Sequence, residues 1–360
     1  MLPALGQPPA TYRNPLAVSI GAPYVLHEPG GPYYLYGTGS DGATAFPTFK
    51  SGDLVNWTPV GQTYARDPGR SWCTGSFWAP EVYRVNGKCY MFYSAQWKNN
   101  PGNEKENFRI GVAVADNPAG PFRDVRNEPV FDPGYPAIDA DVLFDSDGRA
   151  YLYYSRCCYK HPVESELADW ARKQGLYTEI EESWIYGVEL TPDFSGIIGQ
   201  PVVLLRPPVT MANPKDAWED LSVTTHEINR RWTEGPCSFK RGSKYFLMYS
   251  ANHVMGDNYS IGYATSNLPL GRFKKAANNP VVRKNTDRRG DVVGTGHDSV
   301  AVSPDGSEMF CVYHARLKGQ NSAEQRVLFL DRMEIRKDGT LVVHGPDTTL
   351  SQPYPSARKR

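Results

Sequence analysis

Hydrophobic and aromatic residues recur along the chain in five short segments that are rich in strand-favouring side chains. Each segment carries alternating tyrosine, phenylalanine or aliphatic residues, and each is interpreted as a central strand of a sheet. The segments are Pro32–Thr38 (PYYLYGT), Lys88–Ser94 (KCYMFYS), Arg149–Ser155 (RAYLYYS), Lys244–Ser250 (KYFLMYS) and Glu308–His314 (EMFCVYH).

A shorter β-prone stretch and a glycine-containing turn precede each segment, as in PEVYRVNG and ADVLFDSDG, which predicts hairpins. Further strand signals follow most segments and end in recurrent turns such as SGDLVNW and ADNPAGPF. Four strands per unit, repeated five times, predict an all-β fold, a five-bladed β-propeller. A propeller of this size forms a single unit, so residues 1–360 are expected to be one catalytic domain.

The interval between the third and fourth segments is much longer than the others, which indicates an insertion. The insertion is expected around residues 157–183, where VESELADWARKQG has helical composition and interleaved charges. A helix between Val163 and Lys173 is therefore predicted outside the blade. It would either wall one side of a cleft or cover a blade edge in solvent, and composition does not choose between these two roles.

The innermost strands of a propeller all start beside the central channel, so equivalent positions in the five units converge on one pocket. Counting back from the aromatic segment by twelve residues, or thirteen in the fifth unit, identifies these positions. They are Ala22, Trp78, Asp139, Glu234 and His297.

Asp139 and Glu234 are two carboxylates on separate units that face one predicted cavity. Glycoside hydrolysis needs such a pair, because one carboxylic acid protonates the leaving oxygen while another group activates water or attacks directly. Crowding two carboxyl groups raises the pKa of at least one of them. An isolated aspartate in a turn more often serves the turn itself, so the argument depends on the shared register.

Bulk composition favours a neutral partner. The 39 basic and 39 acidic residues balance, so no overall field favours nucleic acid or an anionic membrane. The 22 tyrosines and 8 tryptophans fill sheet cores in most cases, and such side chains also line sugar-binding clefts. No apolar run approaches the ~20 residues needed to span a bilayer.

The N-terminal stretch MLPALGQPPATYRNP is too short and proline-rich for a signal peptide. The protein is expected to be soluble, but its compartment stays open between cytoplasmic and secreted after removal of a signal. Its cysteines lack the CxxC pairs of a zinc site and are too sparse for a disulfide scaffold, so buried thiols are expected. They are Cys73, Cys89, Cys157, Cys158, Cys237 and Cys311.

These residues together resemble glycoside hydrolase family 43, whose members are five-bladed propellers that act mainly as α-L-arabinofuranosidases, β-xylosidases and arabinanases. The resemblance covers nearly the whole chain. It depends on NPL at Asn14, APYV at Ala22, SGDLVNW at Ser51, FWAPEVY at Phe77, AIDADVLFDSDGRAYL at Ala137, TEGPCSFK at Thr233, GTGHDSV at Gly294 and RVLFLDRMEIRKDG at Arg326.

The resemblance implies inverting hydrolysis, with Glu234 as general acid and Asp139 as the carboxylate that orients it and tunes its pKa. A third carboxylate should act as base. In the family's pattern an aspartate precedes the proline of the first blade, where this chain has Ala22 before Pro23. The resemblance therefore implies a base-deficient form that binds its substrate and barely hydrolyses it.

The family's histidine motif maps onto His297, which in many members holds a central calcium ion or its waters. A required cofactor is not implied. The resemblance also places Trp78, Phe77, His297 and Arg316 on the substrate. Packing is the alternative role for Trp78, and a surface ion pair is the alternative for Arg316.

Other functions fit the sequence less well. The GxGxxG match at Gly37–Gly42 is followed by TAFPTFK, which cannot open the helix that a nucleotide site requires. Neither HExxH nor GxSxG occurs. Propellers that act on fructans commonly carry cysteine after the acid, whereas Gly235 follows Glu234 here.

A non-catalytic carbohydrate-binding propeller stays open, although the retention of Asp139 and Glu234 favours a recent or engineered loss of the base. Within the family, the chain ends soon after the fifth blade, which favours an α-L-arabinofuranosidase over a β-xylosidase or arabinanase. The expected partner is a neutral polysaccharide or oligosaccharide such as arabinan or arabinoxylan, with no nucleic acid and no membrane.

Overall fold

Five four-stranded antiparallel sheets surround a central axis in the computed structural model, which describes residues 10–28, 30–39, 45–211, 214–221, 225 and 227–357. Blade 1 consists of β2 (Gly21–His27), β3 (Tyr33–Thr38), β4 (Ala45–Ser51) and β5 (Thr58–Ala65). Blade 2 consists of β6 (Cys73–Val85), β7 (Lys88–Trp97), β8 (Phe108–Ala115) and β9 (Arg123–Asp124).

Blade 3 consists of β10 (Ala137–Phe144), β11 (Ala150–Arg156), β13 (Ile185–Leu190) and β14 (Ile197–Leu205). Blade 4 consists of β16 (Thr233–Arg241), β17 (Lys244–Ala251), β18 (Ser260–Ser266) and β19 (Lys274–Lys275). Blade 5 consists of β20 (Val292–Val302), β21 (Met309–Leu317), β22 (Val327–Ile335) and β23 (Leu341–Val343). The predicted five-bladed propeller is confirmed, and each predicted aromatic segment forms the second strand of its blade.

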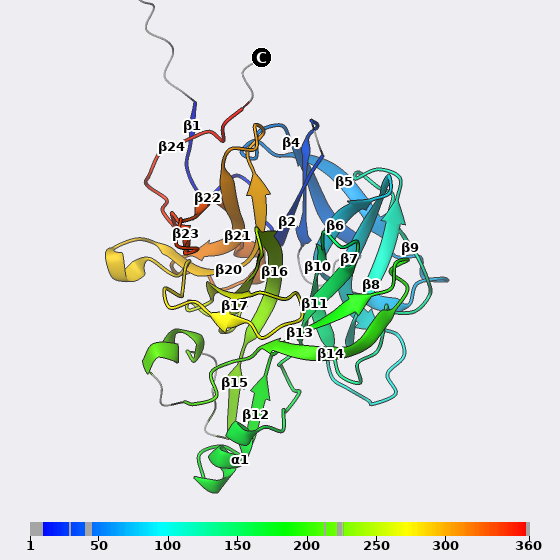
Figure 1. Ribbon diagram of the computed structural model, residues 1–360, viewed down its shortest axis with the longest axis vertical. Coiled ribbons are helices and arrows are strands. Elements are labelled where there is room, and N and C mark those ends of the chain that lie inside the picture. The colour runs from blue at the N-terminus through cyan, green and yellow to red at the C-terminus, as the bar shows by residue number, and fades with distance from the viewer. Residues whose placement is uncertain are drawn as a thin grey trace, which may run out of the picture.

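The five innermost strands β2, β6, β10, β16 and β20 gather at the middle of the molecule (Figure 1). Strand β2 contacts both β6 and β20, so the ring of blades closes. A short pair formed by β1 (Thr11–Tyr12) and β24 (Gln352–Pro353) joins the two ends of the described chain beside blade 5. Residues near the two ends of the described chain thus pair with each other and stabilise the closed ring of blades.

Aromatic side chains of the second strands fill the space between neighbouring blades. Tyr36, Tyr93, Tyr153, Tyr249 and Tyr313 are each fully buried. Four of the five hydroxyl groups donate to carbonyl or carboxylate oxygens, for example Tyr36 to the carbonyl of Pro118 at 2.6 Å and Tyr313 to Asp331 at 2.6 Å. A tyrosine suits this position because its ring adds apolar area and its hydroxyl finds a polar partner at the edge of the core.

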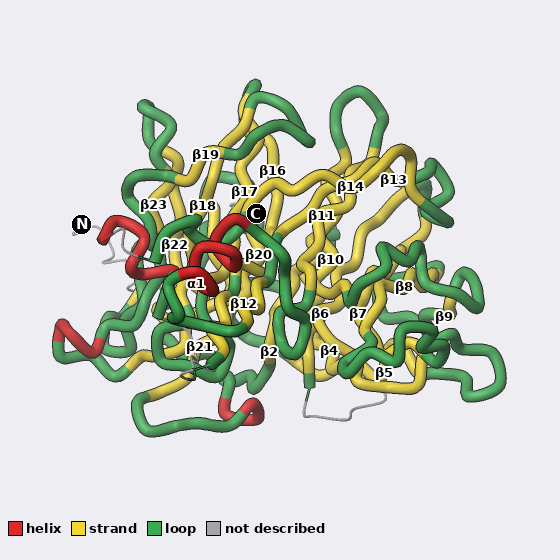
Figure 2. The backbone as a smooth tube through the Cα atoms, turned by 90° about the horizontal axis from the view of Figure 1, so that it is seen from below, coloured by secondary structure: helices red, strands yellow, loops and turns green. Residues whose placement is uncertain are grey.

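An insertion lobe projects from blades 3 and 4 and lies in front of the blades when seen from below (Figures 1 and 2). The predicted helix is α1 (Glu166–Lys173), which begins after Ser165, whose side chain accepts the backbone N–H of Ala168 at 3.2 Å. The lobe has a second half that the sequence did not reveal, between β14 and β16. Strand β12 (Glu179–Glu182) of the first half pairs in parallel with β15 (Ile228–Arg231) of the second.

Buried ion pairs hold the two halves of the lobe together. Arg231 donates to Glu182 at 2.8 Å, and both side chains are fully buried. Such a pair is costly to break, because removal of one partner leaves the other charge buried alone.

Short 3₁₀ helices lie at η1 (Pro214–Glu219), η2 (Thr286–Arg288) and η3 (Ala323–Gln325).

The structure bears on three further expectations. All six cysteines are free and buried, as expected. The GxGxxG match lies partly outside the described residues, and the segment after it is strand β4 rather than a helix. In the part of the chain that the structure describes, no helix has the length and apolar character needed to cross a bilayer.

Candidate active site

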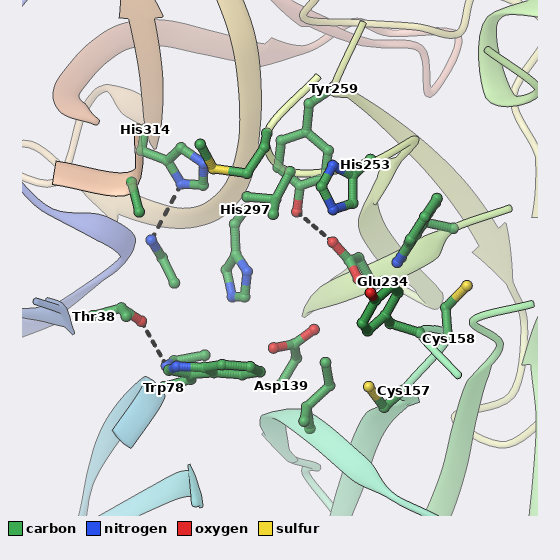
Figure 3. Close-up of a pocket in the computed structure, with 18 of the residues that line it drawn as sticks. Thr38, Trp78, Asp139, Cys157, Cys158, Glu234, His253, Tyr259, His297 and His314 are labelled. Atoms are coloured by element: carbon green, nitrogen blue, oxygen red, sulfur yellow. Dashed lines mark hydrogen bonds between the residues drawn. The ribbon is translucent and has the colours of Figure 1, made fainter. Parts of the chain in front are cut away.

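A pocket of about 340 Å³ lies on the propeller axis and receives side chains from all five blades. Its lining includes the five residues that sequence register placed there, Ala22, Trp78, Asp139, Glu234 and His297. Figure 3 shows Asp139, Glu234 and His297 around one shared space, with Trp78 along its side. The prediction that these positions converge on one pocket is confirmed.

Each innermost strand contains a β-bulge at the pocket, with one residue in the left-handed region of backbone space. These five residues form what we term the bulge ring, and their φ angles lie between 43° and 57°. The pairing register shifts across every one of them. The members are Ala22, Ala79, Asp139, Gly235 and His297.

A cycle of hydrogen bonds links the bulge ring from blade to blade. Each ring N–H donates to a side chain on the second strand of the preceding blade, over 2.7 to 3.2 Å. The acceptors are Thr38, Ser94, Ser155, Ser250 and, from blade 5 to Ala22, Nδ1 of His314. The cycle ties the five bulges to one another around the pocket.

In blades 2 and 4, the position predicted from the sequence register lies one residue before the bulge. Ala79 and Gly235 are the structural equivalents of Asp139, and Trp78 and Glu234 each precede the bulge. A bulge re-aims the side chains around it, so residues on either side of the extra position face the pocket. Trp78 and Glu234 therefore line the cavity although they are not strict equivalents of Asp139.

Asp139 lies buried beside the blade 4 bulge. Its Oδ2 accepts the N–H of Gly235 at 3.2 Å. Burial raises the pKa of Asp139, while His297, the Gly235 N–H and the Ser155 hydroxyl act in the opposite direction. Asp139 thus touches the backbone next to Glu234 and fixes the position of that segment.

Glu234 is buried, and the Tyr259 hydroxyl donates to its Oε1 at 3.1 Å (Figure 3). Burial first, and the charge of Asp139 second, raise the pKa of Glu234 well above its ordinary value. This is the direction of shift expected for two buried carboxyl groups that share one pocket. Tyr259 reaches Glu234 only because Gly296 has no side chain, since a Cβ there would lie 2.1 Å from the tyrosine ring.

His297 is partly buried, and burial lowers its pKa. Calcium takes 6–8 oxygen ligands, and imidazole is not among its preferred donors. Across the described residues, no group of three or more His, Cys, Asp or Glu side chains is arranged to hold a metal ion. The side chains present therefore do not fit a calcium ion that the protein binds directly, and calcium at His297 stays a prediction.

Two of the predicted substrate contacts need correction. Phe77 is 2% exposed and packs against Phe46, Tyr64 and Tyr93 in the core between blades, so it does not line the pocket. Trp78, the next residue, does line it and stacks on Phe108 with ring centroids 4.0 Å apart. Successive strand residues point to opposite faces, so only one of the pair can face the cavity.

Arg316 is the second correction, because it lies behind the pocket wall. It is fully buried and donates to the backbone carbonyls of Gln320 and Met255, at 2.7 and 2.8 Å. It therefore braces a loop of the wall, and its Nη2 also pairs at 4.0 Å with the exposed carboxylate of Asp257. Arg326 lines the pocket instead, with its guanidinium against Gly21, where a Cβ would lie 2.2 Å from it. The only sequence signal for Arg326 is its place at the head of the last motif.

The insertion lobe contributes its base, not its helix, to the pocket. Cys157, Cys158 and Tyr159 lead from β11 into the lobe and line the cavity, as does Trp232, which leads out of it. No residue of α1 does. The lobe is thus a cleft wall at its base, while α1 packs on Ile180 of β12 away from the pocket.

Comparison with known proteins agrees with this geometry. The chain matches Glycosyl hydrolases family 43 over residues 12–341. It is 28% identical to a β-D-galactofuranosidase of Aspergillus niger, over 93% of this chain and 82% of that protein. It is 24% identical to an extracellular exo-α-(1→5)-L-arabinofuranosidase of Streptomyces chartreusis, over 86% of this chain and 83% of the relative.

Among solved structures, a thermostable family-43 glycoside hydrolase superposes with a TM-score of 0.81 at 35% identity, covering 97% of this chain and 100% of that one. The family match covers nearly the whole sequence. It agrees with the four-stranded blades around an axial pocket and with the buried pair of carboxyl groups in that pocket. The chain belongs to glycosyl hydrolases family 43.

Proposed function

We propose that the axial pocket binds α-L-arabinofuranosides and that this chain, with alanine at position 22, hydrolyses them very slowly by an inverting mechanism. The observation that carries the proposal is the bulge ring. Two of its blades bring Asp139 and Glu234 together, while the equivalent position in blade 1 is Ala22. A carboxyl group is therefore available for the proposed acid role, whereas the position proposed for the base carries an alanine.

Glu234 would act as general acid, because its raised pKa keeps the carboxyl group protonated near neutral pH. Its proton passes to the glycosidic oxygen as the bond from that oxygen to the anomeric carbon breaks. Water attacks the opposite face of the anomeric carbon, and its proton must pass to a base. Asp139 holds the backbone at Gly235 and, through its charge, helps keep Glu234 protonated.

Inversion requires a base about 6.5–9.5 Å from the acid, so that water fits between them. An aspartate at position 22 would suit the backbone, because Asp139 adopts the same left-handed conformation in blade 3. Arg326, which packs against Gly21, would hold such an aspartate ionised. Alanine provides no acceptor for the proton of the water.

Among the curated sequence relatives, those that match over most of the chain favour a furanose. The galactofuranosidase and the exo-arabinofuranosidase match over 93% and 86% of it, whereas a xylosidase/arabinosidase of Humicola insolens matches over 56%. The first of these matches supports β-D-galactofuranosides as a second candidate substrate. β-Xylosidase, arabinanase and non-catalytic sugar binding are the remaining alternatives.

The test compares the unmodified chain with Ala22→Asp on 4-nitrophenyl α-L-arabinofuranoside, β-D-galactofuranoside and β-D-xyloside, and on arabinan and arabinoxylan. A restored base should raise kcat about 10²–10⁴-fold with little change in affinity. Azide should partly rescue the unmodified chain, because a small anion fits where the carboxylate is missing. A folded Ala22→Asp protein that is inactive on every pentoside and furanoside, while the unmodified chain still binds them, would establish sugar binding instead.

A further inference from the structure

A third carboxylate, Glu106, lines the pocket and has no part in the chemistry described above. It belongs to the loop between β7 and β8 in blade 2 and is partly buried. Burial raises its pKa, and Lys160 and Cys157 oppose that shift. Glu106 is therefore an acidic group in the pocket that is partly open to a ligand.

The fold makes little use of this carboxyl group. Within the described residues, its one hydrogen-bonding neighbour is the Cys157 thiol, 3.8 Å from Oε2. A thiol is a weak donor, so most of the acceptor capacity of the carboxylate is unused. The nearby wall is largely apolar, since Phe108, Ile138 and Cys157 form one cluster with Trp78 packed against it.

The backbone at Glu106 is strained, with a φ of 57°. Left-handed backbone is uncommon for a residue other than glycine, asparagine or aspartate, and it persists where the surroundings enforce it. The surroundings here are ordered. Asn100 exchanges two hydrogen bonds of 2.8 Å with the backbone of Glu104, and Glu104 pairs with the buried Arg109 at 3.2 Å. The loop thus holds Glu106 over the pocket at a cost in stability.

We infer that Glu106 is a substrate-binding residue that accepts a hydrogen bond from a hydroxyl group of the bound sugar. The inference rests on the proposed function and deepens it. A carboxylate beside an apolar wall matches a sugar, which presents hydroxyl donors next to an apolar ring face. Glu106 is not the missing base, because it lies beside Cys157 of blade 3 while the vacant base position lies in blade 1.

The decisive variant is Glu106→Gly, because glycine relieves the strain and removes the carboxylate. It should raise the melting temperature and weaken sugar binding at least about tenfold, the effect expected for loss of a hydrogen bond to a charged group. Asn103→Gly is the matched control. Asn103 lies in the same loop at a φ of 50° and does not line the pocket, so this variant should leave affinity unchanged. Glu106→Gln, which keeps the shape, should weaken binding without relief of strain.

Calorimetry on the unmodified chain and these variants, with 4-nitrophenyl α-L-arabinofuranoside and α-1,5-L-arabinobiose, gives the answer. Weaker binding of both ligands assigns Glu106 to the sugar that is cleaved off, and weaker binding of arabinobiose alone assigns it to the next sugar. Unchanged affinity for both in Glu106→Gly and Glu106→Gln would overturn the inference alone. If the unmodified chain binds neither ligand and Ala22→Asp hydrolyses neither, the proposed function fails and the inference fails with it.

Discussion

Two layers of buried carboxyl groups lie along the channel, and they differ in what surrounds them. The pocket layer holds Asp139 and Glu234. The inner layer, formed by Glu81, Asp141 and Asp298, follows directly after the bulges, where regular pairing resumes. Burial raises the pKa of all three inner groups, to about 7 for Asp141 and about 8 for Asp298.

The pocket layer faces a cavity and is supplied with donors. Gly235 and Tyr259 donate to Asp139 and Glu234, and the cavity beside them is large enough for a sugar. The inner layer does not line that cavity, and neither side-chain oxygen of Asp298 has a partner on another residue in the described part of the chain. Donors do not distinguish the layers, since Ser238 donates to Asp141 and Tyr83 donates to Glu81. A raised pKa is also common to both layers, so only the cavity marks a site for chemistry.

The largest expected difference is in catalysis. In the Ala22→Asp background, Glu234→Gln should lower kcat about 10²–10⁴-fold on alkyl arabinofuranosides, because the leaving oxygen then receives no proton. Asp298→Asn should leave kcat within about twofold. Initial rates at one saturating substrate concentration check both variants. Equal losses in the two would show that the layers do not differ in function.

The inner layer should instead govern how stability depends on pH. The pKa of Asp298 is raised to about 8 in the fold, so the unfolded chain loses this proton first. The stabilisation of the fold by protonated Asp298 is fully present below about pH 4, the ordinary aspartate pKa, and is lost as the pH rises through about 8. Between these two pH values the free energy of unfolding falls by about 1.4 kcal/mol per pH unit.

Asp298→Asn should therefore flatten the decline in unfolding free energy between pH 5 and 8, as measured by urea denaturation. Asp116→Asn, at an exposed aspartate, is the control and should leave the slope unchanged. An identical slope in Asp298→Asn and the unmodified chain would mean that Asp298 is ionised in the folded protein.

Tyr259 should have a smaller, specific effect on the acid. Its hydrogen bond opposes the rise in the pKa of Glu234, so Tyr259→Phe should raise that pKa further. In the Ala22→Asp background the alkaline limb of the kcat profile should move to higher pH, and kcat should fall by about tenfold or less. Loss of activity with an unmoved alkaline limb would indicate a packing role for Tyr259 alone.

The sequence predicted the fold better than the details of the site. The five aromatic segments repeat, and repetition reveals blades without any knowledge of their contacts. Register located Asp139 and His297, but it missed the offset at Trp78 and Glu234, because a bulge adds a residue without a sequence signature. The second half of the lobe was missed as well, since its partner strand is distant in sequence.

The contacts that loop residues make in the pocket could not be predicted from the sequence either. Tyr259 reaches Glu234 through the space left by Gly296, and Glu106 is held over the pocket by Asn100 and Glu104. Both arrangements depend on tertiary contacts rather than on any local pattern. Phe77 was placed on the substrate wrongly, because the resemblance carried both neighbouring aromatic residues over and the burial of Phe77 between blades depends on tertiary packing.

The prediction with the smallest expected effect concerns backbone strain, which the bulge ring has and the inner layer lacks. Every member of the bulge ring has a positive φ, whereas Glu81, Asp141 and Asp298 do not. Ala22, at a φ of 46°, bears a left-handed cost of roughly 1–2 kcal/mol, and glycine would avoid it. Glycine also loses more backbone freedom on folding, by roughly 0.5–1 kcal/mol. Ala22→Gly should therefore stabilise the protein by up to about 1 kcal/mol, and Ala79→Gly, at a φ of 43°, should do the same. Ala140→Gly, one residue beyond the ring and without a positive φ, should destabilise it instead. Urea denaturation of the three variants decides the matter, and a loss of stability in all three would show that the ring is not strained.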